Sequence, residues 1–368
     1  MEYVNLGDVA TYINGYAFKP EQRGKKGLPI IRIQDLNGNS HDLGFFDGEY
    51  PEQVEINTGD ILISWSGSLG VYKWNKGKAL LNQHIFKVLF NKIEIDKEYF
   101  CYAIRNSLSS MSQQTHGATM KHITKKDFDN ISIPYPDLNE QKKIANNLNI
   151  VNKLIMFYEK ELILFEQMVK ARFIEMFGNM ILNPHKWEKF LLAELCDVRD
   201  GTHDSPKYHS KGYPLITSKN ITGGKIKFSG CNLISKEDFD KINHRSKVDY
   251  GDILMPMIGT IGNPVIVDIK DEFAIKNVAL VKLKKDSLVN NIFIKSLLES
   301  DYFYKTVIDK VRGGTQKFIS LGDIRKLEIC LPPIELQNQF ADFVQQVDKS
   351  RFDIKKSIIE LEREVVYD

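Results

Sequence analysis

Residues 136–178 read PDLNEQKKIANNLNIVNKLIMFYEKELILFEQMVKARFIEMFG, and this stretch decides the fold. Its apolar residues recur at alternating spacings of four and three, which places them along one stripe of a helix that can pair with a second helix. Asp137 can cap the first turn, and Gly178 followed by Pro184 stops the last one. We therefore expect a helix of about 40 residues, or about 60 Å at ~1.5 Å per residue. The stripe consists of Ile144, Leu148, Val151, Ile155, Tyr158, Leu162, Phe165 and Val169.

A second copy of this stripe lies 196 residues further along the chain, on a helix predicted to begin near Pro333. It consists of Phe340, Val344, Val347, Arg351, Ile354, Ile358, Leu361 and Val365. Arg351 is the exception to its apolar character, and either loosens the helix pairing or marks a partner contact. Because neither helix fits inside one globular half, we expect the two to pair, antiparallel if a pseudo-two-fold axis relates the halves. Two unrelated amphipathic surface helices are the alternative.

The rest of the chain repeats in the same order, which indicates an internal duplication. The sequence LGDVATYING at 6–15 corresponds to LAELCDVRDG at 192–201, and GDIL at 59–62 corresponds to GDIL at 251–254. Further on, GATMKHI at 117–123 corresponds to GGTQKFI at 313–319, Pro136 to Pro332 and Gln141 to Gln337. Each match is weak alone, but their shared order favours two copies of one unit.

Each globular half, 1–137 and 183–332, is predicted to have a mixed α/β fold. The apolar runs at 60–65, 85–90, 253–258 and 278–283 favour strands, and the spacing at 96–109 and 290–304 favours helices. The fold class is therefore α/β (α+β), with two mixed α/β domains related by a pseudo-two-fold axis. Two long antiparallel coiled-coil helices, 138–178 and 333–368, are expected to separate them.

The composition favours DNA binding only weakly, because 50 basic residues stand against 48 acidic ones and the pI is about 8.1. Any DNA contact must therefore use locally placed basic residues. The four cysteines form no Cys-x-x-Cys pair, which fits a reduced setting. No apolar stretch approaches the ~18–20 residues needed to cross a bilayer. We expect a soluble, cytoplasmic protein without membrane contact.

Catalytic signatures are missing from the sequence. It contains no Gly-x4-Gly-Lys-Ser/Thr loop and no His-Glu-x-x-His zinc motif. Residues 183–187, NPHKW, begin like the Asn-Pro-Pro-aromatic motif of amino-methyltransferases but lack the second proline. We therefore expect a binding protein without catalytic residues, bound metal or cofactor, although an enzyme with an unrecognised active site is an alternative.

Four polar turns at matching places in the two halves are candidates for DNA contact. Glycines let the backbone approach phosphate, whereas Thr, Gln, Lys and Arg donate to phosphates or base edges. Ordinary tight loops and solvated strand ends explain the same residues. When the two halves are aligned, Trp65 corresponds to Ile258, and Asn82 corresponds to Ile275. The candidates are Arg32, Gln34, Ser64, Trp65, Ser66, Gln83, Thr119, Lys121 and His122 in the first half, and Thr202, His203, Ser218, Lys219, Asn220, Thr260, Lys276, Asn277, Thr315, Gln316 and Lys317 in the second.

Together these motifs resemble the specificity (S) subunits of type I restriction–modification systems, and the resemblance covers nearly the whole chain. It rests on the duplication, the GDIL strands, the Gly-x-Thr loops, the segment Pro136–Gln141 that opens the first long helix, and VKARFIEMFG at 169–178 that closes it. It implies a non-catalytic subunit of a phage-defence complex, in which 1–137 and 183–332 are target-recognition domains. Each would read half of a split, asymmetric site in double-stranded DNA.

The resemblance also implies the partners. The helices 138–178 and 333–368 would act as a spacer and as the dock for two methyltransferase subunits, which use S-adenosylmethionine. Restriction subunits, which are motor nucleases, would use ATP and magnesium, so this chain itself would bind none of these cofactors. A spacer of ~60 Å corresponds to roughly 17 base pairs. A system that only methylates, or a coiled-coil interaction scaffold unrelated to DNA, remains an alternative.

Overall fold

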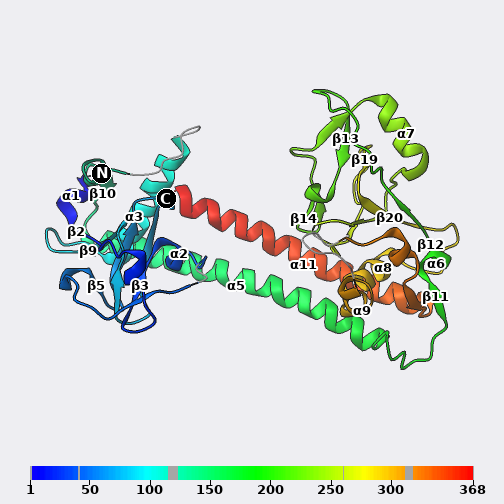
Figure 1. Cartoon of the computed structure of the whole chain (residues 1–368), viewed down its shortest axis with the longest axis horizontal. Coiled ribbons are helices and arrows are strands. Elements are labelled where there is room, and N and C mark those ends of the chain that lie inside the picture. Colours follow the sequence, from blue (N-terminus) through cyan, green and yellow to red (C-terminus); the bar gives the residue numbers. More distant parts are fainter. Residues whose placement is uncertain (1, 40–41, 115–122, 260, 311–317, 368) are drawn as a thin grey trace. The chain divides into compact units, whose positions relative to one another are not determined.

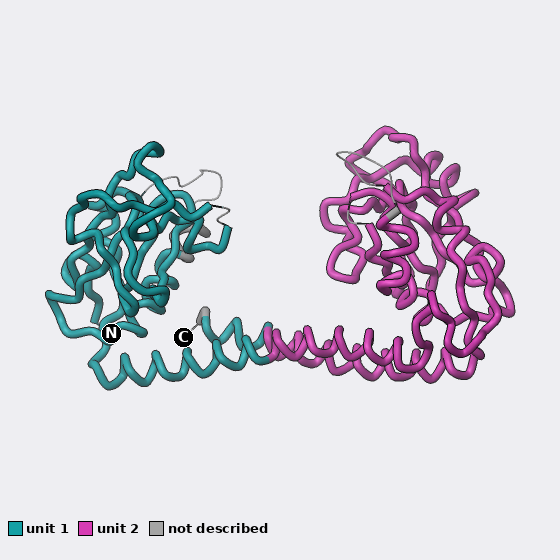
Figure 2. Tube along the Cα trace, turned by 60° about the horizontal axis from the view of Figure 1, so that its bottom comes forward, with its two compact units in different colours: residues 1–157, 359–368 teal, residues 158–358 magenta. Residues whose placement is uncertain are grey.

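A computed structural model describes residues 2–39, 42–114, 123–259, 261–310 and 318–367 (Figure 1). The chain divides into two compact units, residues 1–157 with 359–368 and residues 158–358, here called unit 1 and unit 2 (Figure 2). Two long helices, α5 (Leu138–Phe177) and α11 (Ile334–Tyr367), each contribute residues to both units.

Unit 1 is built on two four-stranded sheets, with strand orders β2-β9-β6-β7 and β4-β3-β8-β5, and on the short pair β1-β10. In the second sheet β3 and β8 are parallel, whereas all pairs in the first are antiparallel. The strands are β1 (Tyr3–Asn5), β2 (Thr11–Asn14), β3 (Leu28–Ile31), β4 (Phe45–Phe46), β5 (Glu55–Ile56), β6 (Ile61–Ser64), β7 (Gly70–Lys73), β8 (Ala79–Leu81), β9 (Ile85–Leu89) and β10 (Ser132–Pro134). The helices are α1 (Leu6–Val9), α2 (Ile33–Leu36), α3 (Lys97–Gln114) and α4 (Lys125–Asp129), with short 3-10 turns η1 (Pro20–Gln22) and η2 (Glu52–Val54).

Unit 2 repeats this topology, which confirms the predicted mixed α/β fold. Its main sheet has the order β12-β20-β17-β18, and in its second sheet, β16-β13-β19, β13 runs parallel to β19 as β3 does to β8. The strands are β11 (Lys189–Leu191), β12 (Cys196–Asp200), β13 (Tyr213–Ile216), β14 (Ile221–Thr222), β15 (Lys225–Ile226), β16 (Asn232–Ile234), β17 (Ile253–Pro256), β18 (Val265–Ile266), β19 (Ala274–Ile275), β20 (Val278–Leu283) and β21 (Glu328–Cys330). The helices are α6 (Leu192–Leu195), α7 (Lys236–Ser246), α8 (Asn291–Leu298), α9 (Asp301–Thr306) and α10 (Leu321–Arg325), with η3 (Ser218–Asn220) and η4 (Ile308–Lys310).

The repeated Gly-Asp-Ile-Leu sequence is a turn followed by a buried strand. Gly59 and Gly251 adopt left-handed φ angles of 99° and 87°, which a glycine reaches without strain. The carboxylate of the next residue accepts a backbone hydrogen bond that closes the turn, at 2.8 Å for Asp60 and 2.7 Å for Asp252. The strand then alternates between two apolar clusters, because successive side chains point to opposite faces of a sheet.

One predicted helix is divided in two. The segment 290–304 forms α8 and α9, because the Ser300 hydroxyl accepts a hydrogen bond from the Phe303 amide and starts a new helix. The helix predicted at 96–109 continues five residues further, to Gln114, as α3.

The ends of α5 lie where the sequence predicts them. Oδ1 of Asp137 accepts hydrogen bonds from the amides of Asn139 and Glu140, at 2.9 and 3.0 Å. At the other end Gly178 has a φ of 69°, and a Cβ there would lie 2.5 Å from Pro184. Glycine is therefore required both by the backbone conformation and by the space available.

A buried glutamine joins each long helix to the unit on which it begins. Gln141 is 1% exposed: its Oε1 accepts from the Asp96 amide (2.9 Å) and its Nε2 donates to the Pro136 carbonyl (2.8 Å). Gln337 is fully buried, accepts from the Asn290 amide (2.9 Å), and donates to the carbonyls of Pro332 (2.8 Å) and Leu288 (3.1 Å). Asp96 and Asn290 lie immediately before α3 and α8. In each unit the hydrogen bond from this backbone amide to the glutamine Oε1 therefore joins the first turn of the long helix to the first turn of a second helix.

Within unit 2, α5 and α11 pack antiparallel. Phe173 contacts Phe340 (ring centroids 5.5 Å), and Glu166 forms an ion pair with Arg351 (2.8 Å). Residue numbers therefore fall along α5 as they rise along α11. All predicted stripe positions are buried or half-buried, and Arg351, with its side chain 25% exposed, marks a contact between the helices.

Replacing Gln337 with alanine should lower the free energy of unfolding of unit 2 by about 3 kcal/mol, because it leaves buried backbone groups without partners. Urea unfolding of the full chain measures this. Gln345→Ala is the matched control, since Gln345 is exposed on the same helix, and it should change stability by less than ~0.5 kcal/mol. Equal effects of both variants would contradict the assigned role.

Arg351→Leu should leave the stability unchanged or raise it by about 1 kcal/mol. The ion pair with Glu166 is largely exposed on the Glu166 side and contributes little, whereas leucine on the stripe adds apolar burial. Thermal unfolding compares this variant with Arg363→Leu, an exposed position on α11 outside the stripe. A clear loss of stability in Arg351→Leu alone would show that the ion pair is needed.

Candidate nucleic-acid interface

Four candidate residues of unit 2 come together where β12 and β19 end. Thr202 and Lys276 form a β-bridge, and the Asn277 amide donates to the Thr202 carbonyl at 3.1 Å. Asn277 has a left-handed φ of 55° and turns the chain into β20. A Cβ on Gly201 would collide with the Ile275 carbonyl, so only glycine allows this approach.

His203 is held between two acceptors in this turn. Its Nδ1 lies 2.8 Å from Asn277 Oδ1, and its Nε2 lies 2.8 Å from Asp200 Oδ2. Arg245, on α7, donates to the other oxygen of Asp200 at 3.2 Å, and Lys276 Nζ donates to Ser205 Oγ at 2.5 Å. Asp200, His203, Arg245, Lys276 and Asn277 are called the His203 cluster below.

The hydrogen bond to Asn277, followed by that to Asp200, raises the pKa of His203 above its usual value of 6.5. A raised pKa means that the stabilisation from these bonds is complete below about pH 6.5 and is lost as the pH rises through the raised value. Because the side chain is 62% exposed, the charge is open to a ligand.

In unit 1 the ring of Trp65, directly after β6, packs against the equivalent turn, which contains His84. The Trp65 ring lies 4.9 Å from that of His84 and 5.6 Å from that of Phe86, and its Nε1 donates to Asn14 Oδ1 at 3.2 Å. Asn14 ends β2 as Asp200 ends β12, and His84 has a left-handed φ of 74° as Asn277 does. One backbone arrangement therefore carries two different sets of side chains.

Two predicted residue pairings between the halves are wrong by one position. The amide of Asn82 donates to the Ile31 carbonyl as that of Lys276 does to Ile216, so Asn82 corresponds to Lys276 and not to Ile275. The amides of Ile123 and Ile319 donate to the carbonyls of Trp65 and Met257, so Trp65 corresponds to Met257 and not to Ile258. The first error arises because unit 1 has one more residue in its turn, between Asn82 and Ile85.

A second pair of equivalent turns follows β3 and β13. Oδ2 of Asp35 accepts from the amide (2.8 Å) and Nε (3.1 Å) of Arg32, and Oδ1 of Asn220 accepts from the amide (3.1 Å) and hydroxyl (2.9 Å) of Thr217. The guanidinium of Arg32 is thereby held by Asp35. Ser218 is half-buried, whereas Gln34 and Lys219 occupy the exposed positions of these turns.

Three candidates are corrected by their burial. Ser64 is fully buried and its hydroxyl donates to the Ser68 carbonyl at 2.5 Å, Ser66 is 8% exposed, and Asn220 is 7% exposed and donates to Lys227. Their side chains serve the protein interior. Gln83 is half-buried beside Asn82. Thr119, Lys121, His122, Thr260, Thr315, Gln316 and Lys317 lie outside the described residues.

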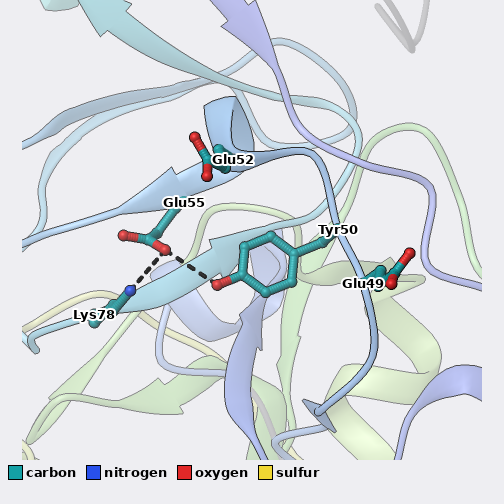
Figure 3. A pocket seen from close by; sticks show the side chains of 5 residues that line it. All are labelled: Glu49, Tyr50, Glu52, Glu55 and Lys78. Atoms are coloured by element: carbon teal, nitrogen blue, oxygen red, sulfur yellow. Dashed lines mark hydrogen bonds and ion pairs between the residues drawn. The ribbon is translucent and has the colours of Figure 1, made fainter.

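A separate hollow of about 770 Å³ in unit 1 is lined by Glu49, Tyr50, Glu52, Glu55 and Lys78 (Figure 3). Glu55 accepts from Lys78 at 2.8 Å and from the Tyr50 hydroxyl at 3.1 Å, and the Lys78 bond lowers the pKa of Glu55. Three carboxylates disfavour phosphate, so this hollow is not a candidate for DNA contact. The described residues contain no cluster of three His, Cys, Asp or Glu side chains suited to a metal ion, and no described helix is long and apolar enough to span a bilayer.

Comparison with known proteins identifies relatives along almost the entire length. A family model described as the type I restriction modification DNA specificity domain matches residues 1–164 and 184–363. The type I restriction enzyme EcoBI specificity subunit of Escherichia coli is 26% identical, over 96% of this chain and 81% of that protein. The MjaVIII specificity subunit of Methanocaldococcus jannaschii is also 26% identical, over 94% and 86%.

Solved structures show the same fold. The S subunit of a type I restriction–modification system from M. genitalium matches with a TM-score of 0.55 and 15% identity, covering 99% of this chain and 93% of that one. A chain from a structure on complex assembly and conformational transition of the type I R-M system matches with a TM-score of 0.61 and 17% identity, covering 99% and 95%.

Each of the two turns after β3 and β13 contains one residue that closes the turn and one exposed residue directly before it. Asp35→Ala and Asn220→Ala should each lower the free energy of unfolding by about 1–2 kcal/mol, because they leave turn amides without acceptors. Gln34→Ala and Lys219→Ala, one position earlier, should change it by less than ~0.5 kcal/mol. Urea unfolding of the four variants provides the comparison, and a large loss in Gln34→Ala or Lys219→Ala would contradict it.

Proposed function

Because the chain belongs to the family of type I restriction–modification DNA specificity domains, we propose that its two units each read one half of a bipartite, asymmetric DNA site. The observation that carries this proposal is the contrast between equivalent turns. The turn in unit 2 bears Thr202 and Lys276 at its β-bridge and Asn277 at its left-handed position, whereas the turn in unit 1 bears Tyr16, Asn82 and His84 at the same places. A duplicated scaffold with divergent side chains suits the reading of two different half-sites.

The charge distribution fits local rather than global attraction to DNA. The chain has a formal net charge of only +2. Exposed cations are instead found in the proposed reading turns, at Lys219 and in the His203 cluster. Base contacts then supply selectivity, and partner subunits supply much of the phosphate binding.

The long helices are proposed to set the spacing of the half-sites and to dock two methyltransferase subunits. A continuous helix of 40 residues is about 60 Å long, or roughly 17 base pairs of DNA. Both helices expose large apolar side chains, and a surface that gathers such side chains favours protein contact. Among them are Ile150, Met156, Ile163, Leu164 and Ile174 on α5, and Phe352 on α11.

Catalysis is assigned to the partners. S-adenosylmethionine would be used by the methyltransferase subunits, and ATP and magnesium by restriction subunits. The chain's own contribution is to choose the sequence at which they act. A system that methylates without cleaving uses the same recognition chemistry and differs only in the presence of restriction subunits.

Sequencing of methylated bases in cells that express this chain with its methyltransferase tests the proposal. A split, non-palindromic motif should appear only when the chain is present. Replacing residues 189–330 with the equivalent segment of a relative should change one half of the motif and leave the other intact. A perfectly palindromic motif would contradict two different half-sites. An active methyltransferase in a stable complex without any chain-dependent motif would favour a helical scaffold unrelated to sequence reading.

A further inference from the structure

We propose that the His203 cluster reads a guanine of the unit 2 half-site through hydrogen-bond donors alone, and that Asp200 is the positioning residue that holds His203 in place. This inference rests on the proposed function and adds the chemical class of base that one unit contacts. It follows from three features of the cluster: the geometry around His203, the orientation this imposes on Asn277, and the Lys276 donor beside that amide.

As the side chains are placed, both ring nitrogens of His203 face an oxygen, which fits an imidazolium with a hydrogen on each nitrogen. Nδ1 and Nε2 each lie 2.8 Å from an oxygen, one in an amide and one in a carboxylate. A neutral imidazole has one donor and one acceptor, whereas the imidazolium has two donors. The charged groups around the ring are Asp200 on β12, Arg245 on α7 and Lys276 in the turn after β19, with Asp204 next to it in the chain. Asp200 stabilises the protonated ring, and Arg245 opposes it.

The protonated ring fixes the orientation of the Asn277 amide. Oδ1 must face the Nδ1–H donor, which leaves the two N–H donors of Nδ2 for a ligand. A freely rotating asparagine can offer both an acceptor and a donor and so suits adenine. Held in this way, Asn277 offers donors only.

Lys276 adds a second donor beside this amide. Its Nζ is fixed by Ser205 Oγ at 2.5 Å and retains further N–H donors. Guanine presents two adjacent acceptors, N7 and O6, in the major groove, whereas adenine and cytosine present an amino donor there and thymine presents the single acceptor O4 beside a methyl group. Two neighbouring donor groups without an acceptor therefore match guanine.

Phosphate is the other acceptor that such donors can bind. The cluster also attracts phosphate, because protonated His203, Arg245 and Lys276 outweigh the single carboxylate of Asp200. Phosphate binding, however, gains nothing from a fixed amide orientation, whereas base discrimination depends on it.

The experiment compares guanine with 7-deazaguanine, which lacks the N7 acceptor, at each guanine of the unit 2 half-site. The chain is assembled with its methyltransferase subunits, and binding to fluorescent duplexes is measured. For the unaltered chain, replacing guanine with 7-deazaguanine should weaken binding by about tenfold at one of these positions. Asn277→Asp keeps the acceptor toward His203 and replaces the donor, so it should abolish this difference. Asn277→Gly, which accommodates the left-handed backbone, should do the same and excludes an effect of the new charge.

The protonation state of His203 provides an independent readout. Discrimination between guanine and 7-deazaguanine should fall as the pH rises through the pKa of His203, because a neutral ring releases the amide. Asp200→Asn should move this fall to lower pH, and His203→Gln should remove the pH dependence. His209→Gln, at an exposed histidine of the same unit, is the matched control and should behave as the unaltered chain.

The outcomes separate this inference from the proposed function. Absence of any chain-dependent methylation motif overturns the proposed function. A motif without guanine in the unit 2 half-site, or a 7-deazaguanine effect that persists in both Asn277 variants, overturns only the inference. A third outcome would also overturn the inference: methylphosphonate substitution weakens binding, the Asn277 variants no longer show this weakening, and 7-deazaguanine has no effect. The cluster would then be assigned to phosphate binding.

Discussion

The hydrogen bonds of two buried glutamine side chains are the contacts on which the rest of each unit depends. An amide in the protein interior must satisfy its donor and its acceptor. Gln141 and Gln337 each accept from the residue immediately before a neighbouring helix and donate to a proline carbonyl just before their own helix. The direction in which a long helix leaves its unit is therefore fixed, at its first turn, relative to that neighbouring helix. Apolar packing alone, as at Phe173 and Phe340, tolerates small rotations that a pair of directed bonds does not.

In each unit, the residues that stabilise the fold occupy different positions from the residues that differ between the two units. Gly-Asp turns, buried strands and the close approach at Gly201 repeat or have equivalents, because they satisfy backbone groups and exclude side chains. The exposed positions of the turns beyond the strands have no such structural role. His84 and Asn277 share a left-handed conformation but no chemistry, and Gln34 and Lys219 occupy the same exposed position with different charge. Recognition can diverge there at little cost to the fold.

Much of this arrangement is predictable from the sequence, and the failures have physical causes. The helix stripe, its Asp137 cap and its Gly178 stop are local patterns, as is the GDIL strand, and all were found from spacing and residue type. Thr202, His203, Lys276 and Asn277 are predicted as candidates because polar residues follow strand ends, and the structure brings these four together. Ser64 and Asn220 were misassigned because a polar residue beside a turn can point inward to satisfy the backbone.

The remaining part of the His203 cluster depends on tertiary contacts. Asp200 lies three residues before His203, but Arg245 is 45 residues from Asp200 along the chain and Asn277 is 74 residues from His203. The position of Arg245 is decided by how α7 packs against β12. This packing cannot be predicted from the spacing of residues along the chain.

The extra residue in the turn between β8 and β9, compared with the turn between β19 and β20, has a consequence for how such proteins diversify. Strand pairing on both sides of the turn is the same in the two units despite the difference in length. An insertion or deletion there is absorbed locally, because the bridge at Asn82 or Lys276 and the left-handed position at His84 or Asn277 are kept while one side chain, that of Gln83, is added. Natural selection can thus explore new target sequences through single-codon changes in loop length, without first having to rebuild the domain.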